Sequence, residues 1–232
     1  EATTGDFVTI YADASRFPGQ IDGLSLGSKY STYADEIKKC VKTETLIQGA
    51  RKYETGAVIF WNGIENKYII LPPFPVTESK ISMGELDTSV LHEALEKRYV
   101  IGVLLVTWGS YAIGIFDAGN LVEWKIGTGF IHKKHKKGGR SQKRFARRTE
   151  EQKKDFLRRV SNRIEEKLAH FTLDYIFFGG NRLIAKPLLQ ECRCLQSEAH
   201  KISPRVLDVR YADRGALVNS LAEITKSLVF TF

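Results

Sequence analysis

Apolar residues recur along the chain with two periods, one typical of helices and one typical of strands. In the first half, Ile37, Val41 and Ile47 are spaced to bury one face of a helix. Asn62-Gly63 separates two short apolar runs, which is a strong signal for a β-hairpin. The pattern therefore predicts a helix over residues 34–53, strands over 57–61 and 67–71, and a helix that starts at Asp87 or Thr88 and ends at Arg98.

A second group of elements begins near Tyr99. Residues 101–106 form a continuous apolar run, as expected of a strand buried on both faces. A four-residue repeat of apolar side chains predicts the buried stripe of a long helix: Phe156, Val160, Ile164 and Leu168. The expected elements are strands over 101–106, 111–116 and 121–126, a helix over 143–170, a strand over 173–178, a helix over 183–191, a strand over 206–209 and a helix over 214–228.

The order of these elements predicts the fold class. Three antiparallel strands, a long helix and then alternating strand and helix is the order of a ribonuclease H-like α/β fold. We therefore expect an α/β (α+β) protein in which residues 1–98 form a small α+β N-terminal domain and residues 99–232 form the ribonuclease H-like domain. With 232 residues, of which 43% are hydrophobic, the chain can bury both cores.

Charge is distributed unevenly between the two predicted domains. Residues 1–99 carry 11 Lys/Arg and 14 Asp/Glu, whereas residues 100–232 carry 24 and 13, and the whole chain has a net charge of +8. A basic half beside a slightly acidic half predicts a surface for a polyanion. The chain has no run of 18 apolar residues and no signal-peptide pattern, so we expect no membrane association. Three cysteines without a C-x-x-C motif favour ordinary thiols in a reducing cytoplasm, with no zinc site.

Much of the positive charge gathers in a polar, glycine-bearing loop predicted over residues 127–142. Nine of the 17 residues in 132–148 are Lys or Arg and none is acidic, a density that a phosphate backbone would neutralise. Composition alone also allows a solvated basic loop or a nuclear-localisation-like tract. Gly138 and Gly139 favour a ligand-binding loop, because paired glycines let the backbone approach a ligand closely. Gln142 lies at the expected end of the loop, where its amide can donate and accept hydrogen bonds without a charge.

Two motifs here resemble a known family. Residues 135–139, His-Lys-Lys-Gly-Gly, and residues 144–147, Arg-Phe-Ala-Arg, are similar to the loop and helix start of the eukaryotic and archaeal class-1 translation termination factors. The resemblance covers residues 100–232 as their catalytic middle domain. It extends at the level of pattern into residues 30–99, as a reduced version of their N-terminal domain.

The loop departs from the termination factors in one informative way. Those proteins carry Gly-Gly-Gln without interruption, whereas Arg140 and Ser141 intervene here. Counted back from the Arg-Phe-Ala-Arg motif, Arg140 stands where their glutamine would, and Gln142 lies two residues further on. An interrupted glycine pair followed by glutamine is similar to the Vms/ANKZF type of release-factor-like peptidyl-tRNA hydrolases.

The resemblance implies a cytoplasmic peptidyl-tRNA hydrolase that acts on stalled ribosomes or large subunits without codon recognition. An aminoacyl ester is labile, so positioning a water and stabilising the oxyanion would suffice, and we expect neither metal nor cofactor. The implied catalytic residues are Gly138, Gly139 and Gln142. The implied RNA-binding residues are Lys133, Lys134, Lys136, Lys137, Arg140, Lys143, Arg144, Arg147 and Arg148. The implied partners are peptidyl-tRNA and the peptidyl-transferase centre of the large subunit. We expect a monomer without a GTPase partner, because the sequence ends at Phe232 without the domain that contacts the GTPase.

Three other functions stay open. A ribonuclease H-like nuclease would cluster carboxylates around two metals, but residues 101–106 contain none. The acidic residues of that domain are scattered: Asp117, Asp174 and Asp208. A non-catalytic ribosome- or tRNA-binding rescue module is favoured by Arg140 in the usual glutamine position. A codon-dependent termination factor would carry the stop-codon motif Thr-Ala-Ser-Asn-Ile-Lys-Ser, and the nearest segment here is residues 32–38.

Overall fold

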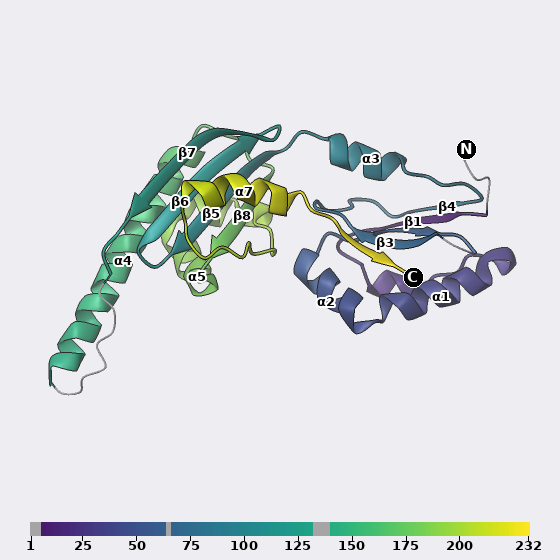
Figure 1. The fold of residues 1–232 in the computed structure, drawn as a ribbon, viewed down its shortest axis with the longest axis horizontal. Helices are drawn as coiled ribbons and strands as arrows, with labels where there is room; N and C mark the ends of the chain where they lie inside the picture. Colours follow the sequence, from purple (N-terminus) through teal and green to yellow (C-terminus); the bar gives the residue numbers. More distant parts are fainter. Residues whose placement is uncertain (1–5, 64–65, 132–139) are drawn as a thin grey trace. The chain divides into compact units, whose positions relative to one another are not determined.

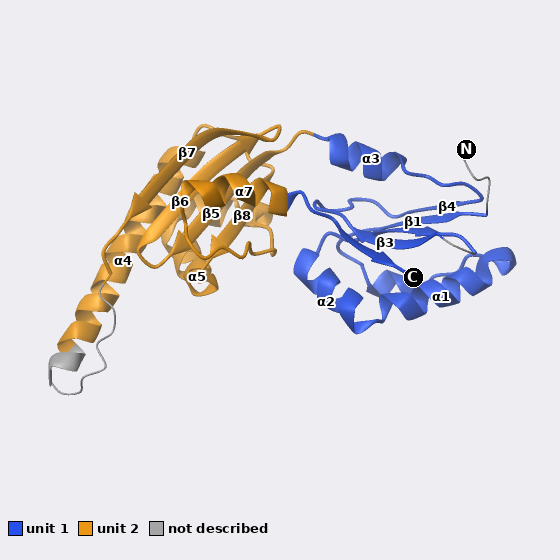
Figure 2. Ribbon diagram, viewed as in Figure 1, with its two compact units in different colours: residues 1–97, 224–232 blue, residues 98–223 orange. Residues whose placement is uncertain are grey.

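The computed structural model describes residues 6–63, 66–131 and 140–232, with no side chain described at residues 140–143. The chain divides into two compact units, residues 1–97 with 224–232 and residues 98–223 (Figure 2). Each unit combines helices with its own β-sheet (Figure 1). The predicted α/β (α+β) class is therefore confirmed. No helix within the described residues has both the length and the apolar character needed to cross a bilayer.

The first unit is built on a five-stranded antiparallel sheet with the order β4-β1-β2-β3-β9. Its strands are β1 (Val8–Ala12), β2 (Ala57–Trp61), β3 (Lys67–Leu71), β4 (Lys80–Met83) and β9 (Leu228–Thr231). The predicted hairpin is confirmed, because β2 and β3 pair with Trp61 opposite Lys67. Its connection is longer than a two-residue turn, since the Asn62 N–H donates to the Asn66 carbonyl.

Two helices cover one face of this sheet, α1 (Ser31–Val41) and α2 (Glu44–Tyr53) (Figure 1). They replace the single helix expected over residues 34–53, because Thr43 adopts an extended conformation between them. Leu46 rather than Ile47 is then fully buried. Two short 3-10 helices, Gly19–Ile21 and Ser28–Tyr30, precede α1.

Helix α3 (Ser89–Glu96) packs against the other face of the sheet. It begins where Asp87 or Thr88 was expected to cap it, but it ends two residues before Arg98. No side chain of α3 is fully buried, and its contact with the apolar cluster around Tyr11 comes from the half-buried Val90 and Leu91. Apolar packing alone therefore holds α3 weakly.

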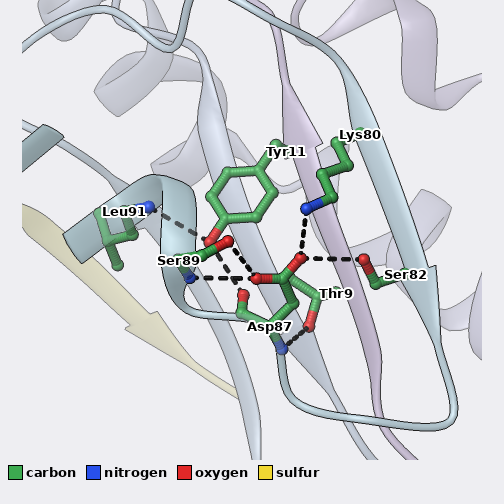
Figure 3. Close-up of polar contacts among 7 residues, drawn as sticks. All are labelled: Thr9, Tyr11, Lys80, Ser82, Asp87, Ser89 and Leu91. Atoms are coloured by element: carbon green, nitrogen blue, oxygen red, sulfur yellow. Dashed lines mark hydrogen bonds and ion pairs between the residues drawn. The ribbon is translucent and has the colours of Figure 1, made fainter. Parts of the chain in front are cut away.

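A polar network around Asp87 fixes the start of α3 (Figure 3). The Asp87 carboxylate accepts hydrogen bonds from the Ser89 N–H at 3.0 Å and from the Ser82 hydroxyl at 3.1 Å, and it pairs with Lys80 at 2.7 Å. The buried Tyr11 hydroxyl donates to the Asp87 carbonyl at 2.8 Å. Strands β1 and β4 and the first turn of α3 thus meet at Asp87, with β1 on its backbone and the other two on its carboxylate.

We expect Asp87→Asn to lower the free energy of unfolding by about 1–2 kcal/mol, because the ion pair with Lys80 is lost. The hydrogen bond from Lys80 holds the pKa of the Asp87 carboxyl well below its ordinary value of 3.8. This contribution is therefore present above the unfolded pKa and lost as the pH falls through the lower folded pKa. Urea unfolding at pH 7 measures it, with Asp35→Asn on the exposed face of α1 as the control. Equal stabilities of the two variants would contradict the role of Asp87.

The second unit is built on a four-stranded sheet with the order β7-β6-β5-β8. Its strands are β5 (Val100–Thr107), β6 (Ser110–Asp117), β7 (Asn120–Thr128) and β8 (Tyr175–Gly180). The predicted antiparallel meander of β5, β6 and β7 is confirmed, and β8 runs parallel to β5. Ala118 and Gly119 both have positive φ, which closes the tight turn between β6 and β7.

Helices cover both faces of this sheet. One face carries α4 (Arg140–Leu168), α5 (Arg182–Glu191) and α6 (Arg193–Ser197), followed by the 3-10 helix Ala199–Lys201. The predicted apolar stripe of α4 is confirmed, because its four members are all buried: Phe156, Val160, Ile164 and Leu168. On the opposite face, α7 (Arg214–Ile224) lays Leu217 on Gly114 of β6, where an added Cβ would meet the leucine at 2.8 Å.

Two predictions near the C-terminus are wrong. The strand expected over residues 206–209 is only a single parallel bridge between Leu207 and Gly179. The helix expected over residues 214–228 ends at Ile224, and the chain then forms β9 at the edge of β3. Leu228 and Phe230 lie on the same face of β9 and pack against the core of the first unit, which stabilises this strand pairing. The last residues, 224–232, therefore belong to the first unit rather than to the 99–232 domain.

Candidate functional site

The loop singled out by the sequence falls between β7, which ends at Thr128, and α4, which begins at Arg140. Six of its predicted site residues lie outside the described residues: Lys133, Lys134, Lys136, Lys137, Gly138 and Gly139. The side chains of Arg140, Gln142 and Lys143 also lie outside them. Helix α4 begins earlier than expected, so Gln142 falls within the bounds of the helix rather than before it. No helix breaker follows Gly139, which agrees with this earlier start.

The N-terminal half of α4 extends beyond the end of the sheet (Figure 1). Three of the residues predicted to bind RNA are described in this part of the helix, and all three are exposed: Arg144, Arg147 and Arg148. Arg147 pairs with Glu151 at 3.0 Å, but both side chains are more than half exposed, so water can readily replace this contact. The first acidic residue of α4 is Glu150. The part of the helix that precedes Glu150 therefore carries cations and no carboxylate, which favours binding of a polyanion.

The next turns of α4 anchor this projecting part on the core. Thr149 is buried, and its hydroxyl donates to the Phe145 carbonyl at 3.0 Å. Lys153 lies over the ring of Trp108, with its Nζ 5.1 Å from the centroid, and it also pairs with Glu150 at 2.8 Å. Phe156 follows as a core residue, 1% exposed. Helix α4 thus changes from an exposed arm to a core element between residues 149 and 156.

Three aromatic rings lie where the loop leaves the sheet. The rings of Trp108 and Tyr111 each have their centroid 6.3 Å from that of Phe156. We call Trp108, Tyr111 and Phe156 the aromatic seat. The last two residues of β7 and the three that follow, which we call the stem (residues 127–131), pass beside this seat. Gly127 pairs with Tyr111 in the sheet, and Ile131 packs against the same core.

A second clamp joins β7 to α4 away from the loop. Lys167 near the end of α4 pairs with Glu123 of β7 at 2.7 Å. The hydrogen bond holds the pKa of the Glu123 carboxyl below its ordinary value and raises the pKa of Lys167. Both groups therefore stay charged at neutral pH. The ion pair joins strand β7, which leads into the loop, to helix α4, which leads out of it.

The scattered carboxylates of this unit do not come together. Asp174 accepts a hydrogen bond from the Val100 N–H at 2.8 Å and so joins the starts of β5 and β8. Asp117 and Asp208 are exposed. Among the residues that the structure describes, no three His, Cys, Asp or Glu side chains are placed to hold a metal ion. The described carboxylates thus give the nuclease alternative no support.

The sequence identified the charged residues of this region but not the aromatic seat. The sequence placed Tyr111 only in a strand and Phe156 only in the buried stripe of a helix, and it assigned no role to Trp108. One signal could have revealed the seat. Gly127 and Gly129 are spaced to face the same side of an extended chain at the start of the predicted loop, and glycines in that position often mark a close approach of another group.

A family model described as acVLRF1, Actinobacteria/chloroflexi VLRF1 release factor, matches residues 99–229. The peptide chain release factor subunit 1 of Aeropyrum pernix is 28% identical over 144 residues, which make up 60% of this chain and 38% of that protein. This chain thus spans well under half the length of that relative.

Solved structures show a more distant likeness. The crystal structure of the archaeal translation termination factor aRF1 aligns with a TM-score of 0.41 and 16% identity, over 97% of this chain and 68% of that chain. Archaeoglobus fulgidus Pelota aligns with a TM-score of 0.28 and 9% identity, over 96% of this chain and 58% of that chain.

Proposed function

Because the chain belongs to the acVLRF1 family of release factors, we propose that it hydrolyses the ester bond of peptidyl-tRNA on stalled ribosomes or large subunits and releases the nascent chain. The protein is a release-factor-like translation factor. That it is of the Vms/ANKZF type, which acts in ribosome-associated quality control, is a prediction. This prediction rests on the interrupted Gly-Gly pair and on Gln142.

The observation that carries the proposal is the exposed basic arm of α4, anchored at one end on a rigid core. Arg144, Arg147 and Arg148 extend along an arm that directly continues the Lys-rich loop of the sequence. Ribosomal RNA and the acceptor end of tRNA are dense in phosphate, and cations on a preformed helix bind them with release of counterions. An arm of this kind can carry a short loop into a narrow RNA-lined site.

Chemistry at the tip needs little acid–base power, because an aminoacyl ester is far more labile than an amide. Gly138 and Gly139 would let the backbone approach the ester closely. Gln142 would orient the attacking water and donate a hydrogen bond to the developing oxyanion. The lysines and arginines of the loop and arm would hold RNA phosphates and leave the reacting atoms to Gln142.

Release without codon recognition fits the first unit. The segment nearest to the stop-codon motif, residues 32–38, lies in α1, where Ala34 and Ile37 are buried in the core and unavailable to a codon. Residues 1–99 also carry more acidic than basic side chains, which disfavours binding along messenger RNA phosphates. We therefore expect hydrolysis to be independent of the codon in the decoding site.

A non-catalytic binding module is the second candidate, favoured by Arg140 at the position where termination factors carry glutamine. A release assay separates the two functions. The protein is incubated with purified peptidyl-tRNA–ribosome complexes, and the released peptide is counted. Hydrolysis above the spontaneous rate supports the enzyme. Stoichiometric binding without release supports the binding module.

We expect reversal of Lys133, Lys134, Lys136 and Lys137 to Glu to weaken ribosome binding and to flatten its dependence on salt. Each lost phosphate contact removes roughly one unit of log–log slope. Binding isotherms at several salt concentrations measure this. Reversal of Lys38, Lys39, Lys42 and Lys52 in the first unit, which changes the charge equally, is the control. An unchanged slope in the loop variant would show that the basic run is only a solvated loop.

A further inference from the structure

We propose that Gly127 and Gly129 are positioning residues for the proposed hydrolysis. Their missing side chains let the stem lie directly on the aromatic seat, and this contact sets the direction in which the loop leaves the sheet. The inference rests on the proposed function and assigns a role to two glycines that precede the lysine-rich run starting at Lys133.

Gly127 lies under the ring of Tyr111. The two residues are paired across β6 and β7. A Cβ built on Gly127 would stand 2.3 Å from Cζ and 2.4 Å from Cε1 of Tyr111, far inside van der Waals contact. Tyr111 is only 7% exposed and packs on Phe156, so its ring has little room to move away. Any side chain at position 127 must therefore displace the stem or the ring.

Gly129 makes the same kind of approach one step closer to the loop. A Cβ at this position would stand 2.7 Å from Cδ2 of Phe156 and 2.9 Å from Nη2 of Arg159. The arginine end can move aside, but the Phe156 ring is 1% exposed and packed between Trp108 and Tyr111. The Gly129 N–H meanwhile donates to the Gly109 carbonyl at 2.8 Å, which holds the stem from its other side.

An added methyl group at Gly129 must displace the stem or the Phe156 ring, and the burial of that ring in the core favours displacement of the stem. The displacement begins at the base of the loop, so it changes where the tip arrives. Catalysis by positioning is sensitive to such shifts, since a misplacement of about 1 Å can cost about 100-fold in rate. Binding through many phosphate contacts tolerates the same shift, because each contact is adaptable and contributes little. We therefore expect the rate of release and the affinity to respond differently.

The experiment measures single-turnover peptide release at saturating protein, together with ribosome affinity. Gly129→Ala is expected to slow release at least about tenfold, with the dissociation constant changed by less than about threefold. Gly215→Ala is the matched control, because its Cβ meets only Asp213 Oδ1, at 3.4 Å. It should release peptide at the wild-type rate.

A compensating variant separates positioning from a loss of fold. Phe156→Leu removes the ring edge that the new methyl group meets. The double variant Gly129→Ala/Phe156→Leu should release peptide faster than Gly129→Ala alone, at a rate close to that of Phe156→Leu alone. Its melting temperature should nevertheless be below that of the wild type, because a core ring is lost. The melting temperature of Gly129→Ala is measured as well, because a rate that recovers in a double variant melting no higher than Gly129→Ala cannot come from restored stability.

Two results would overturn the inference while leaving the proposed function intact. One is wild-type release by Gly129→Ala, and the other is a double variant no faster than Gly129→Ala. A wild-type protein that releases no peptide from any complex would instead overturn the proposed function, and the inference with it.

Discussion

Peptide release is expected to fall about 100- to 1000-fold in a Gln142→Ala variant, the range found when one oxyanion-stabilising hydrogen-bond donor is removed from an active site. The reason is chemical. Gln142 carries the one side-chain amide in residues 132–148, where nine of the 17 residues are Lys or Arg. Cations hold phosphates, but they position a water at an ester poorly. Ribosome affinity should be nearly unchanged, since the amide makes no phosphate contact in this account.

The matched control is Arg140→Ala, which changes the residue at the glutamine position of the termination factors. It removes one phosphate contact and should lower affinity slightly while release continues. Both variants are compared in the same single-turnover assay with saturating protein. An inactive Arg140→Ala variant beside an active Gln142→Ala variant would assign the catalytic position to Arg140 instead.

Unfolding of the second unit is expected to become easier by about 3–5 kcal/mol when Phe156 is replaced by Ala. Phe156 is 1% exposed and lies between Trp108 and Tyr111, so its removal leaves a cavity that the surrounding rings fill only in part. A loss of this size is a large fraction of the stability of a typical domain. The variant should therefore also lose the seat on which the stem rests.

Phe145→Ala is the control on the same helix, because this ring is 46% exposed. Its truncation should cost less than about 1 kcal/mol. Urea unfolding curves followed by far-UV circular dichroism compare the two variants. Similar losses in both would contradict the division of α4 into an exposed arm and a core section.

The sequence predicted those elements whose pattern is local and strong. Residues 57–61 and 67–71 are short apolar runs on either side of a turn signal, and they match β2 and β3 to the residue. The apolar stripe from Phe156 to Leu168 identified the buried face of α4 for the same reason. In each case the local pattern of apolar residues was sufficient to predict the element.

Elements that depend on distant partners escaped prediction. Strand β1 (Val8–Ala12) is buried along its whole length between β2 and β4, and its short run carries no alternation to mark it. Strand β9 forms only because β3, far away in the chain, offers a free edge. Residues 206–209 have strand-like composition but make a single bridge. In all three segments, pairing with a distant strand determines whether a strand forms.

The candidate site likewise has features that the sequence shows and features that only the structure shows. Its charges and glycines are visible in the sequence, because nine cations without an acid over residues 132–148 need no structure to be noticed. The aromatic seat is not visible in the sequence, since Trp108 lies in the turn between β5 and β6, Tyr111 in β6 and Phe156 in α4. The reason for Gly127 and Gly129 appears only when those rings are placed beside the stem.

The central claim is that hydrolysis depends on the loop and not on a codon. One release assay tests it, comparing ribosomes with a stop codon in the decoding site, ribosomes with a sense codon, and isolated large subunits that carry the same peptidyl-tRNA. Similar single-turnover rates on all three substrates, lost in each case in Gln142→Ala, are the predicted result. A strong preference for the stop-codon complex, or no release from large subunits, would contradict the claim and favour a codon-dependent termination factor.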